Sequence, residues 1–295
     1  MIRDGPISVE RYMALCNEHY YATRDPLGAA GDFTTAPEIS QMFGEIVGAA
    51  LADCWLRAGA PADAVYVELG PGRGTLAADA LRVLAKAGLR PRVHFIETSP
   101  VLRREQAERV PGAHWHRSLD ELPEAPMLLV GNEFFDALPI RQWVGEEERR
   151  VAIRDDGLMF TSDGEIREDS PAREAAANAI ATHLARHGGV AVIIDYGHAR
   201  TSDGDTLQAV RGHGFADVLT NPGEQDLTAH VDFEALANAA EGVAMTPVVA
   251  QGEWLERLGI KPRAAALAET HPERAEEVAA ALRRLTASDQ MGDLF

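Results

Sequence analysis

The sequence contains little cysteine and no long hydrophobic run. Only two cysteines, Cys16 and Cys54, occur in 295 residues, and neither forms a Cys-x-x-Cys pair or has metal-ligand spacing. This scarcity excludes a disulfide-stabilised fold and predicts two buried, reduced thiols. No apolar run approaches the roughly 18 residues needed to cross a bilayer, and residues 1–13 lack an apolar or arginine-rich leader. We therefore expect a cytoplasmic protein with no membrane insertion.

Basic residues are also scarce. Acidic residues outnumber Lys and Arg by 46 to 28, so the formal net charge is −18, and lysine occurs only at positions 86 and 261. A strongly negative chain repels phosphate backbones and anionic lipid head groups. The composition therefore argues against nucleic-acid binding and favours a basic partner. The 46% content of hydrophobic residues is ample for the core of a large α/β domain.

A glycine-rich turn is the most informative stretch of the chain. Residues 65–69 are typical of a buried strand, and residues 75–87 carry apolar side chains at helical intervals. Between them, every second residue of 70–74 is glycine, which allows a sharp turn and a close approach of a ligand to the backbone. The spacing differs from the dinucleotide fingerprint, and Glu68 at the strand end would repel a pyrophosphate. The turn therefore predicts a pocket for a cationic or amino-bearing ligand.

A second acid supports this pocket. Glu97 follows a predicted strand at residues 94–96 and lies about 20 residues past the glycines, where one βαβ unit brings an acid to ribose hydroxyls. Strand, turn, helix, strand and acid in this order predict a nucleotide site. Together with the strand and helix pattern that resumes at residues 170–194, they predict an α/β protein with a doubly wound, mostly parallel sheet. The alternative is an ordinary strand-to-helix turn with incidental glycines.

The pattern Glu-x-Gly-x-Gly-x-Gly at residues 68–74 resembles the first motif of class I methyltransferases that use S-adenosylmethionine (SAM), whose ammonium and sulfonium groups are positively charged. The resemblance implies a Rossmann-like fold with SAM as the cofactor. A third predicted strand, residues 113–116, precedes two residues that such enzymes typically place against adenine. The cofactor-binding residues implied by the resemblance are Glu68, Gly70, Pro71, Gly72, Gly74, Glu97, Ser118 and Leu119.

Residues 31–45 carry a narrower resemblance, which extends over nearly the whole chain. Their sequence, Gly-Asp-Phe-Thr-Thr-Ala-Pro-Glu-Ile-Ser-Gln-Met-Phe-Gly-Glu, is similar to the hallmark of one methyltransferase family. The best known member of that family is a mitochondrial complex I assembly factor that methylates an arginine of a quinone-oxidoreductase subunit. The resemblance implies a protein substrate of this kind, with Gly31, Thr34 and Thr35 near the cofactor. Thr35 is also expected to cap a helix that reaches Trp55, in a capping box with Glu38.

Carboxylates follow a fourth predicted strand, residues 127–131. Asn132, Glu133 and Asp136 come directly after it, and the carboxyl ends of parallel strands face the ligand crevice. Methyl transfer from a sulfonium requires positioned reactants and no covalent nucleophile. An arginine acceptor keeps its proton up to about pH 12, so carboxylates must hold it. We assign catalytic roles to Glu133, Asp136 and Asp32 and a cofactor role to Asn132. The alternative is that these carboxylates cap or solvate the strand end.

The domain organisation is predicted from shifts in pattern. A helical N-terminal flank with the hallmark loop is expected at residues 1–60, followed by the methyltransferase domain at 61–295. One insertion, at about 140–168, alternates short apolar runs with turns and predicts an antiparallel hairpin. Another, at 198–231, is loop-like and is expected to wall the active site.

The remaining elements follow from capping signals and periodicity. We expect an N-terminal helix capped by Ser8, and the family resemblance implies a last antiparallel strand that would be cut short at residues 291–295. The other predicted elements are helices at 170–188, 232–240, 252–258 and 262–286 and strands at 190–194 and 245–250.

Other chemistries find less support. His183 and His187 are spaced i,i+4 but lack the glutamate of a zinc-protease motif, so no metal site is expected. Two rival functions remain open: a SAM-binding assembly or chaperone module without transfer, and a small-molecule methyltransferase with a closed pocket. The sequence makes no prediction of oligomeric state.

Overall fold

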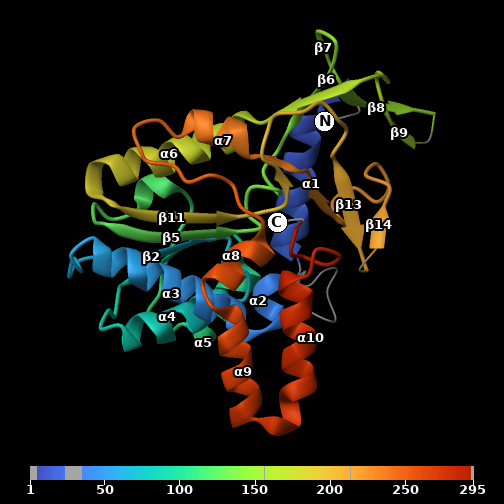
Figure 1. Ribbon diagram of the computed structural model, residues 1–295. Coiled ribbons are helices and arrows are strands. Elements are labelled where there is room, and N and C mark those ends of the chain that lie inside the picture. The colour runs from blue at the N-terminus through green and yellow to red at the C-terminus, as the bar shows by residue number, and fades with distance from the viewer. Residues whose placement is uncertain (1–4, 24–34, 156, 213, 294–295) are drawn as a thin grey trace.

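The computed structural model describes residues 5–23, 35–155, 157–212 and 214–293. In these ranges the centre of the fold is a five-stranded parallel sheet with the order β11-β5-β2-β3-β4 (Figure 1). The strands are β2 (Val65–Leu69), β3 (Val93–Ile96), β4 (His114–His116), β5 (Met127–Asn132) and β11 (Gly189–Ile194). The chain adds β3 and β4 on one side of β2 and then β5 and β11 on the other. This reversal confirms the predicted doubly wound fold and creates a crevice beyond the carboxyl ends of β2 and β5.

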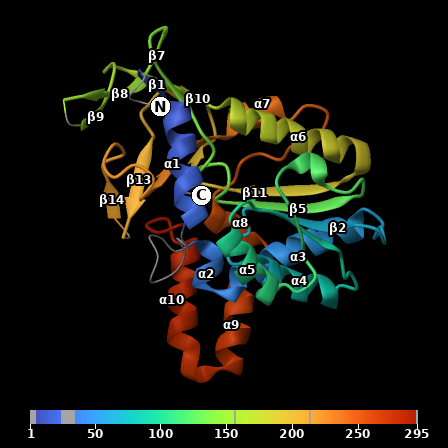
Figure 2. The same cartoon turned by 180° about the vertical axis from the view of Figure 1, so that it is seen from behind.

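Helices cover both faces of the sheet. Figures 1 and 2 show α3 (Gln41–Arg57), α4 (Thr75–Lys86) and α5 (Pro100–Arg109) on one face and α6 (Pro171–His187) and α7 (Phe233–Ala239) on the other. Alternate strand residues feed the two apolar cores. Tyr66 and Leu128 pack with α3 and α4, whereas Val67 and Leu129 pack with α6 and α7. All residues of β2 and β5 are buried, as expected for parallel strands with both faces covered.

Two glycines set the close packing of α3 on α4. A Cβ atom on Gly48 would lie 2.7 Å from the Cα atom and 2.8 Å from the carbonyl oxygen of Ala80. A Cβ atom on Gly44 would lie 2.7 Å from the Cβ atom of Asp79. Only glycine therefore permits this approach of the two helices, and α4 is the helix that begins at the glycine-rich turn.

The structure corrects the expected start of the second helix. α1 (Val9–Thr23) begins as predicted, with the Ser8 Oγ atom accepting a 3.1 Å hydrogen bond from the Arg11 N–H. Thr35, however, makes no side-chain cap, and α2 (Ala36–Ile39) is only one turn long. Ser40 is extended and its hydroxyl accepts from the Met42 N–H at 3.2 Å, so a second cap interrupts the helix and starts α3.

The first insertion is antiparallel, as predicted. Within the described residues its strands form two three-stranded sheets, β10-β6-β7 and β1-β8-β9, and the second sheet recruits β1 from the N-terminus. The strands are β1 (Ile7–Ser8), β6 (Arg141–Val144), β7 (Glu147–Glu148), β8 (Arg150–Arg154), β9 (Gly157–Phe160) and β10 (Ile166–Asp169).

The second insertion is more ordered than the loop that we expected. It contains the three-stranded sheet β14-β13-β15, which packs beside α1 through buried Ala209 and Leu227. Each strand is only two to four residues long, too short for alternation to be visible in the sequence. The strands are β12 (Gly197–His198), β13 (Gln208–Arg211), β14 (Gly214–Ala216), β15 (Asp226–Thr228) and β16 (Val231–Asp232).

Two C-terminal predictions are wrong. Residues 245–250 form no strand; Pro247 removes a backbone donor there, and Met245 and Val248 are exposed. The single helix expected at 262–286 is broken near Pro272 into α9 (Ile260–Thr270) and α10 (Ala275–Thr286), which follow α8 (Gln251–Arg257). α9 and α10 project from the domain as an antiparallel pair (Figures 1 and 2). In the described part of the chain no strand pairs with the outer edge of β11, so the last antiparallel strand implied by the family resemblance is not seen there.

Cys16 is buried and Cys54 is half-buried, and both are free thiols. Over the residues with a described placement, no helix is long and apolar enough to span a bilayer. In the same residues, no group of three or more His, Cys, Asp or Glu side chains is arranged to hold a metal ion. The division into a flank at 1–60 and a domain at 61–295 remains a prediction.

Candidate active site

A cavity of about 860 Å³ lies at the carboxyl ends of β2, β3 and β5. Its size is in the range of small-molecule and cofactor sites. One end is formed by the glycine-rich turn and the residues after β3. The other end is formed by α1, the segment after β5, and the β14-β13-β15 sheet.

Most of the predicted site residues meet in this cavity. Those in its wall are Thr35, Glu68, Gly70, Pro71, Gly72, Glu97, Asn132, Glu133 and Asp136. Gly74, Ser118 and Leu119 are not in the wall, whereas Arg117, next to Ser118, is. Gly31, Asp32 and Thr34 lie outside the described residues. The individual cofactor and catalytic roles remain predictions.

Gly74 lies outside the cavity wall and packs at the start of α4. It is the N-terminal cap of α4, with a φ of 77°, and the position of a Cβ atom there would face Val110 and Gln106 at 3.6–3.7 Å. Leu119 also lies outside the cavity wall. It begins a short 3-10 helix and packs against the apolar core beside α6.

Gly70 and Gly72 give the turn its shape. Their φ angles are 54° and 52°, a region that favours glycine. A Cβ atom on Gly70 would also lie 3.1 Å from the Phe134 ring. The turn therefore presents backbone to the cavity, as the sequence predicted.

Glu68 is a buried acid at the end of β2. Its side chain is 3% exposed, and its Oε2 atom accepts a 2.6 Å hydrogen bond from the Tyr66 hydroxyl. Burial raises the pKa of Glu68 to about 8, although the hydrogen bond from Tyr66 opposes this shift. A cation in the cavity would favour the ionised form of this carboxyl group.

Glu97 is held by residues that the sequence did not single out. Its Oε1 atom accepts from the Ser99 N–H at 2.7 Å, and its Oε2 atom accepts from the Gln106 amide at 3.1 Å. Gln106 is fully buried and also accepts a 2.8 Å hydrogen bond from the Trp115 indole. A glutamine in the middle of a helix carries no sequence signal of such a role.

Glu133 lies at the turn that follows β5. Its φ of 48° is unusual for a residue other than glycine, and its N–H donates to the Ile194 carbonyl at 2.8 Å. The Asn132 amide donates to its Oε1 atom at 3.3 Å. Burial raises the pKa of Glu133 to about 8, and the charge of Asp136 adds to the shift.

Asp195 positions the segment that carries Asp136. It is 1% exposed, and its Oδ2 atom accepts from the N–H groups of Phe135 at 2.9 Å and Asp136 at 3.2 Å. Burial raises the pKa of Asp195, as do the charges of Asp136 and Glu133. Asp195 directly follows β11, so its place at a strand end was visible in the sequence, whereas its contacts with the turn after β5 were not.

Arg173 on α6 also holds the segment that carries Asp136. Its guanidinium donates to the carbonyl oxygens of Phe135 at 2.7 Å, Asp136 at 2.9 Å, Ala229 at 2.9 Å and His230 at 2.6 Å. This buried cation therefore satisfies backbone carbonyls and ties the turn after β5 to the second insertion.

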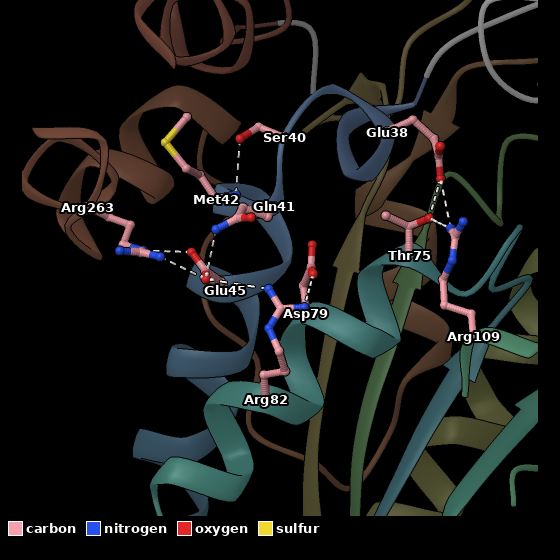
Figure 3. Close-up of polar contacts among 10 residues, drawn as sticks. All are labelled: Glu38, Ser40, Gln41, Met42, Glu45, Thr75, Asp79, Arg82, Arg109 and Arg263. Atoms are coloured by element: carbon pink, nitrogen blue, oxygen red, sulfur yellow. Dashed lines mark hydrogen bonds and ion pairs between the residues drawn. The ribbon is translucent and has the colours of Figure 1, made fainter. Parts of the chain in front are cut away.

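Glu38 joins the hallmark segment, residues 31–45, to the helix that begins at the glycine-rich turn (Figure 3). It accepts a hydrogen bond from the Thr75 hydroxyl at the start of α4 and lies 3.9 Å from the Arg109 guanidinium and 3.8 Å from that of Arg73. It therefore links α2 to α4 and α5 and does not form the expected capping box with Thr35. In the same view, Glu45 on α3 binds Arg263 of α9 through two hydrogen bonds of 2.7 and 3.0 Å.

Two acceptor atoms in the cavity wall lack donors. Among the described residues, the Oδ1 atoms of Asn132 and Asp136 are buried and have no hydrogen-bond partner. A buried acceptor without a donor is costly, so these atoms call for a ligand with N–H groups. The ammonium group of SAM could supply such a donor to Asn132 and pair with the carboxylate of Glu68, and the residues present therefore fit this cofactor.

Known proteins resemble this chain over nearly its full length. A family model described as S-adenosyl-L-methionine-dependent methyltransferase matches residues 46–168 and 146–250. The protein arginine methyltransferase NDUFAF7 homolog, mitochondrial, of Drosophila melanogaster is 36% identical over 356 aligned residues, covering 100% of this chain and 81% of the relative. The NDUFAF7 protein of Danio rerio is 34% identical and covers 100% of this chain and 83% of the relative.

Solved structures agree. The crystal structure of a Burkholderia thailandensis protein bound to S-adenosyl-homocysteine is 25% identical and superposes with a TM-score of 0.83, over 99% of this chain and 87% of that one. The expectation of a cytoplasmic protein is contradicted, because the Drosophila, Danio and Mus musculus relatives are all named as mitochondrial proteins. The family match spans more than half of the chain, and the relatives exceed 30% identity over most of their own length. The chain therefore belongs to this family of SAM-dependent methyltransferases.

Proposed function

We propose that the protein transfers the methyl group of SAM to an arginine side chain of a second protein. We propose further that this acceptor protein is a subunit of a respiratory quinone oxidoreductase of the complex I type. The relatives named as protein arginine methyltransferases support the acceptor class. The net charge of −18 favours a basic acceptor.

One observation carries the proposal. Glu133 and Asp136 share a cavity with the glycine-rich turn, and the buried Asp136 Oδ1 atom has no donor among the described residues. A guanidinium group presents five N–H donors in a fixed plane and pairs with carboxylates. The cavity can therefore hold a methyl donor and an arginine side chain at the same time.

We call the part of the cavity formed by the glycine-rich turn and the residues after β3 the cofactor end. We call the part formed by α1, the segment after β5 and the β14-β13-β15 sheet the acceptor end. The acceptor end suits a protein more than a small molecule. Phe215 of β14 belongs to the cavity wall and is 83% exposed, so the cavity reaches the protein surface. Where the structure describes this wall it is open to the surface, whereas a small-molecule methyltransferase is expected to have a closed pocket.

The protein residues have two tasks in this reaction. SAM supplies an electrophilic methyl group when it is bound. Glu133 and Asp136 would orient the guanidinium nitrogen toward that group. As the C–N bond forms, the methyl–sulfur bond would break and S-adenosyl-homocysteine would leave as a neutral thioether, while Glu133 would accept the proton that the nitrogen loses. With a pKa of about 8, Glu133 is a stronger base than an ordinary carboxylate, and its ionised form, which takes up the proton, predominates above about pH 8. Asp195 and Arg173 keep the turn after β5 in place, so the carboxylates are oriented before the acceptor arrives.

Transfer of a labelled methyl group from SAM to a purified quinone-oxidoreductase subunit tests the proposal. We expect Glu133→Gln to lower the rate of transfer by about 100-fold or more, with SAM affinity nearly unchanged. Glu146→Gln, in the exposed turn of the first insertion, is the matched control and should transfer at the wild-type rate. Full turnover by Glu133→Gln would remove Glu133 from the reaction. No label on any acceptor, with SAM still bound, would favour a SAM-binding assembly module.

A further inference from the structure

A further carboxylate belongs to the acceptor end of the cavity, in addition to Glu133, Asp136 and the exposed Glu18. Asp226, on β15 of the second insertion, is 4% exposed and contributes to the same wall as Glu133 and Asp136. Its charge contributes to raising the pKa of Glu133, which places the two carboxylates within electrostatic range of each other. This acid comes from a segment nearly 100 residues further along the chain than Glu133.

Asp226 is held rigidly by α1. The Tyr21 hydroxyl donates a 2.8 Å hydrogen bond to its Oδ1 atom, and Tyr21 is itself part of the cavity wall. Burial raises the pKa of Tyr21, and the charges of Asp226 and Asp136 add to the shift. Tyr21 therefore stays a neutral hydrogen-bond donor next to both carboxylates.

The neighbouring backbone is locked to the Asp136 segment. Asn17 of α1 donates to the carbonyl oxygens of Leu227 at 2.8 Å and Ala137 at 3.0 Å, and it accepts from the Leu227 N–H at 3.2 Å. The Ala229 N–H donates to the Asp136 carbonyl at 3.1 Å. β15 and the turn after β5 therefore form one unit, so the positions of Asp136 and Asp226 relative to each other are fixed in advance.

The described residues at this end of the cavity supply no side-chain cation. The arginines of the wall, Arg73 and Arg117, belong to the glycine-rich turn and to the segment after β4. The buried Arg173 directs its donors to backbone carbonyls. The buried Asp136 Oδ1 atom has no donor among the described residues, and a ligand with N–H groups would supply one.

We propose that Asp226, positioned by Tyr21, is an acceptor-binding residue that holds the guanidinium group together with Asp136 and selects charged side chains over neutral ones. The inference rests on the proposed function and adds to it the residues that recognise the acceptor. Loss of Asp226 weakens acceptor binding, whereas the cofactor end of the cavity keeps its contacts.

The test is a calorimetric titration of N-acetyl-L-arginine methylamide into protein saturated with S-adenosyl-homocysteine. We expect Asp226→Asn to weaken binding by about tenfold or more and Tyr21→Phe by about threefold, while the affinity for S-adenosyl-homocysteine stays within about twofold in both. Glu224→Gln is the matched control, since Glu224 is two residues away and exposed. The uncharged citrulline analogue should bind at least about tenfold more weakly than the arginine compound.

Three outcomes would overturn the inference: no binding of the arginine compound to the wild type, equal binding of the citrulline analogue, or unchanged affinity in Asp226→Asn. The failure of the proposed function is distinguishable from these outcomes. If the labelled subunit assay detects no arginine methylation, the proposed function itself is wrong. If the wild type transfers and Asp226→Asn keeps the wild-type KM for the acceptor, only the role of Asp226 is wrong.

Discussion

The side-chain amide of Gln106 donates a 2.7 Å hydrogen bond to the carbonyl oxygen of Gly72. The same nitrogen donates to the Glu97 carboxylate at 3.1 Å. One fully buried amide on α5 thus joins the glycine-rich turn after β2 to the acid after β3. The two parts of the predicted cofactor site depend on each other through this residue.

Gln106→Leu should therefore lower the affinity for SAM by about tenfold, because the Gly72 carbonyl and the Glu97 carboxylate lose a shared donor in a buried place. Calorimetric titration with SAM measures the effect. Glu105→Leu, on the exposed side of the same helix, should leave the affinity unchanged. Equal affinities for Gln106→Leu and the wild type would show that the bridge has no role in binding.

The affinity for SAM should depend on pH through Glu68. The pKa of Glu68 in the free protein is about 8, and a bound cation favours the ionised form. Binding therefore releases a proton, and affinity rises as pH increases towards about 8 and then levels off. The comparison is with Glu68→Gln, which should bind more weakly above about pH 8 and lack this dependence. If the affinity for SAM depended on pH equally in both proteins, the titrating group would be another one, in the protein or in the ligand.

Turnover should depend on pH through Glu133. At saturating SAM, kcat/KM for the acceptor reports groups of the SAM-bound protein, and the ionised form of Glu133 is the active one. Because burial raises the pKa of Glu133 to about 8, kcat/KM should fall about tenfold for each pH unit below that value. For Glu133→Gln, kcat/KM for the acceptor should be low and should not change with pH. A wild-type profile that is already flat between about pH 6 and 8 would contradict the role of Glu133.

Gly48→Ala should reduce the free energy of unfolding by about 1–3 kcal/mol. The added methyl group would collide with the backbone of Ala80 at 2.7 Å and push α4 away from α3. Gly204→Ala is the control, because no atom lies within 4 Å of the added Cβ and its φ is not in the left-handed region. Chemical denaturation of both variants measures the difference. Equal stabilities would mean that the two helices can separate at little cost.

The fold was predictable because its signals are local. The buried strand at 65–69, the glycines that follow and the acid at 97 lie within one βαβ unit, and each has a direct physical reason. The cofactor end of the cavity follows from the same stretch. Fold class and cofactor are accordingly the predictions that the family and the solved structures confirm.

The acceptor end was less predictable because its contacts join distant segments. Tyr21 and Asp226 are 205 residues apart, and Arg173 reaches Phe135 across 38. No periodicity links such positions. The prediction of one helix from Thr35 failed for a different reason. Both Thr35 and Ser40 have the extended backbone of a cap, but only the Ser40 side chain accepts a hydrogen bond from the helix that follows it, so the long helix starts five residues later.

The most direct test of the account is an amino-acid analysis of the acceptor after one turnover with methyl-labelled SAM and wild-type protein. If the acid-walled cavity holds an arginine side chain, the label should be recovered on a guanidinium nitrogen of arginine, and Glu133→Gln should transfer at least about 100-fold less label in the same time. Label recovered on lysine, on a carboxylate or on a small molecule would contradict the account.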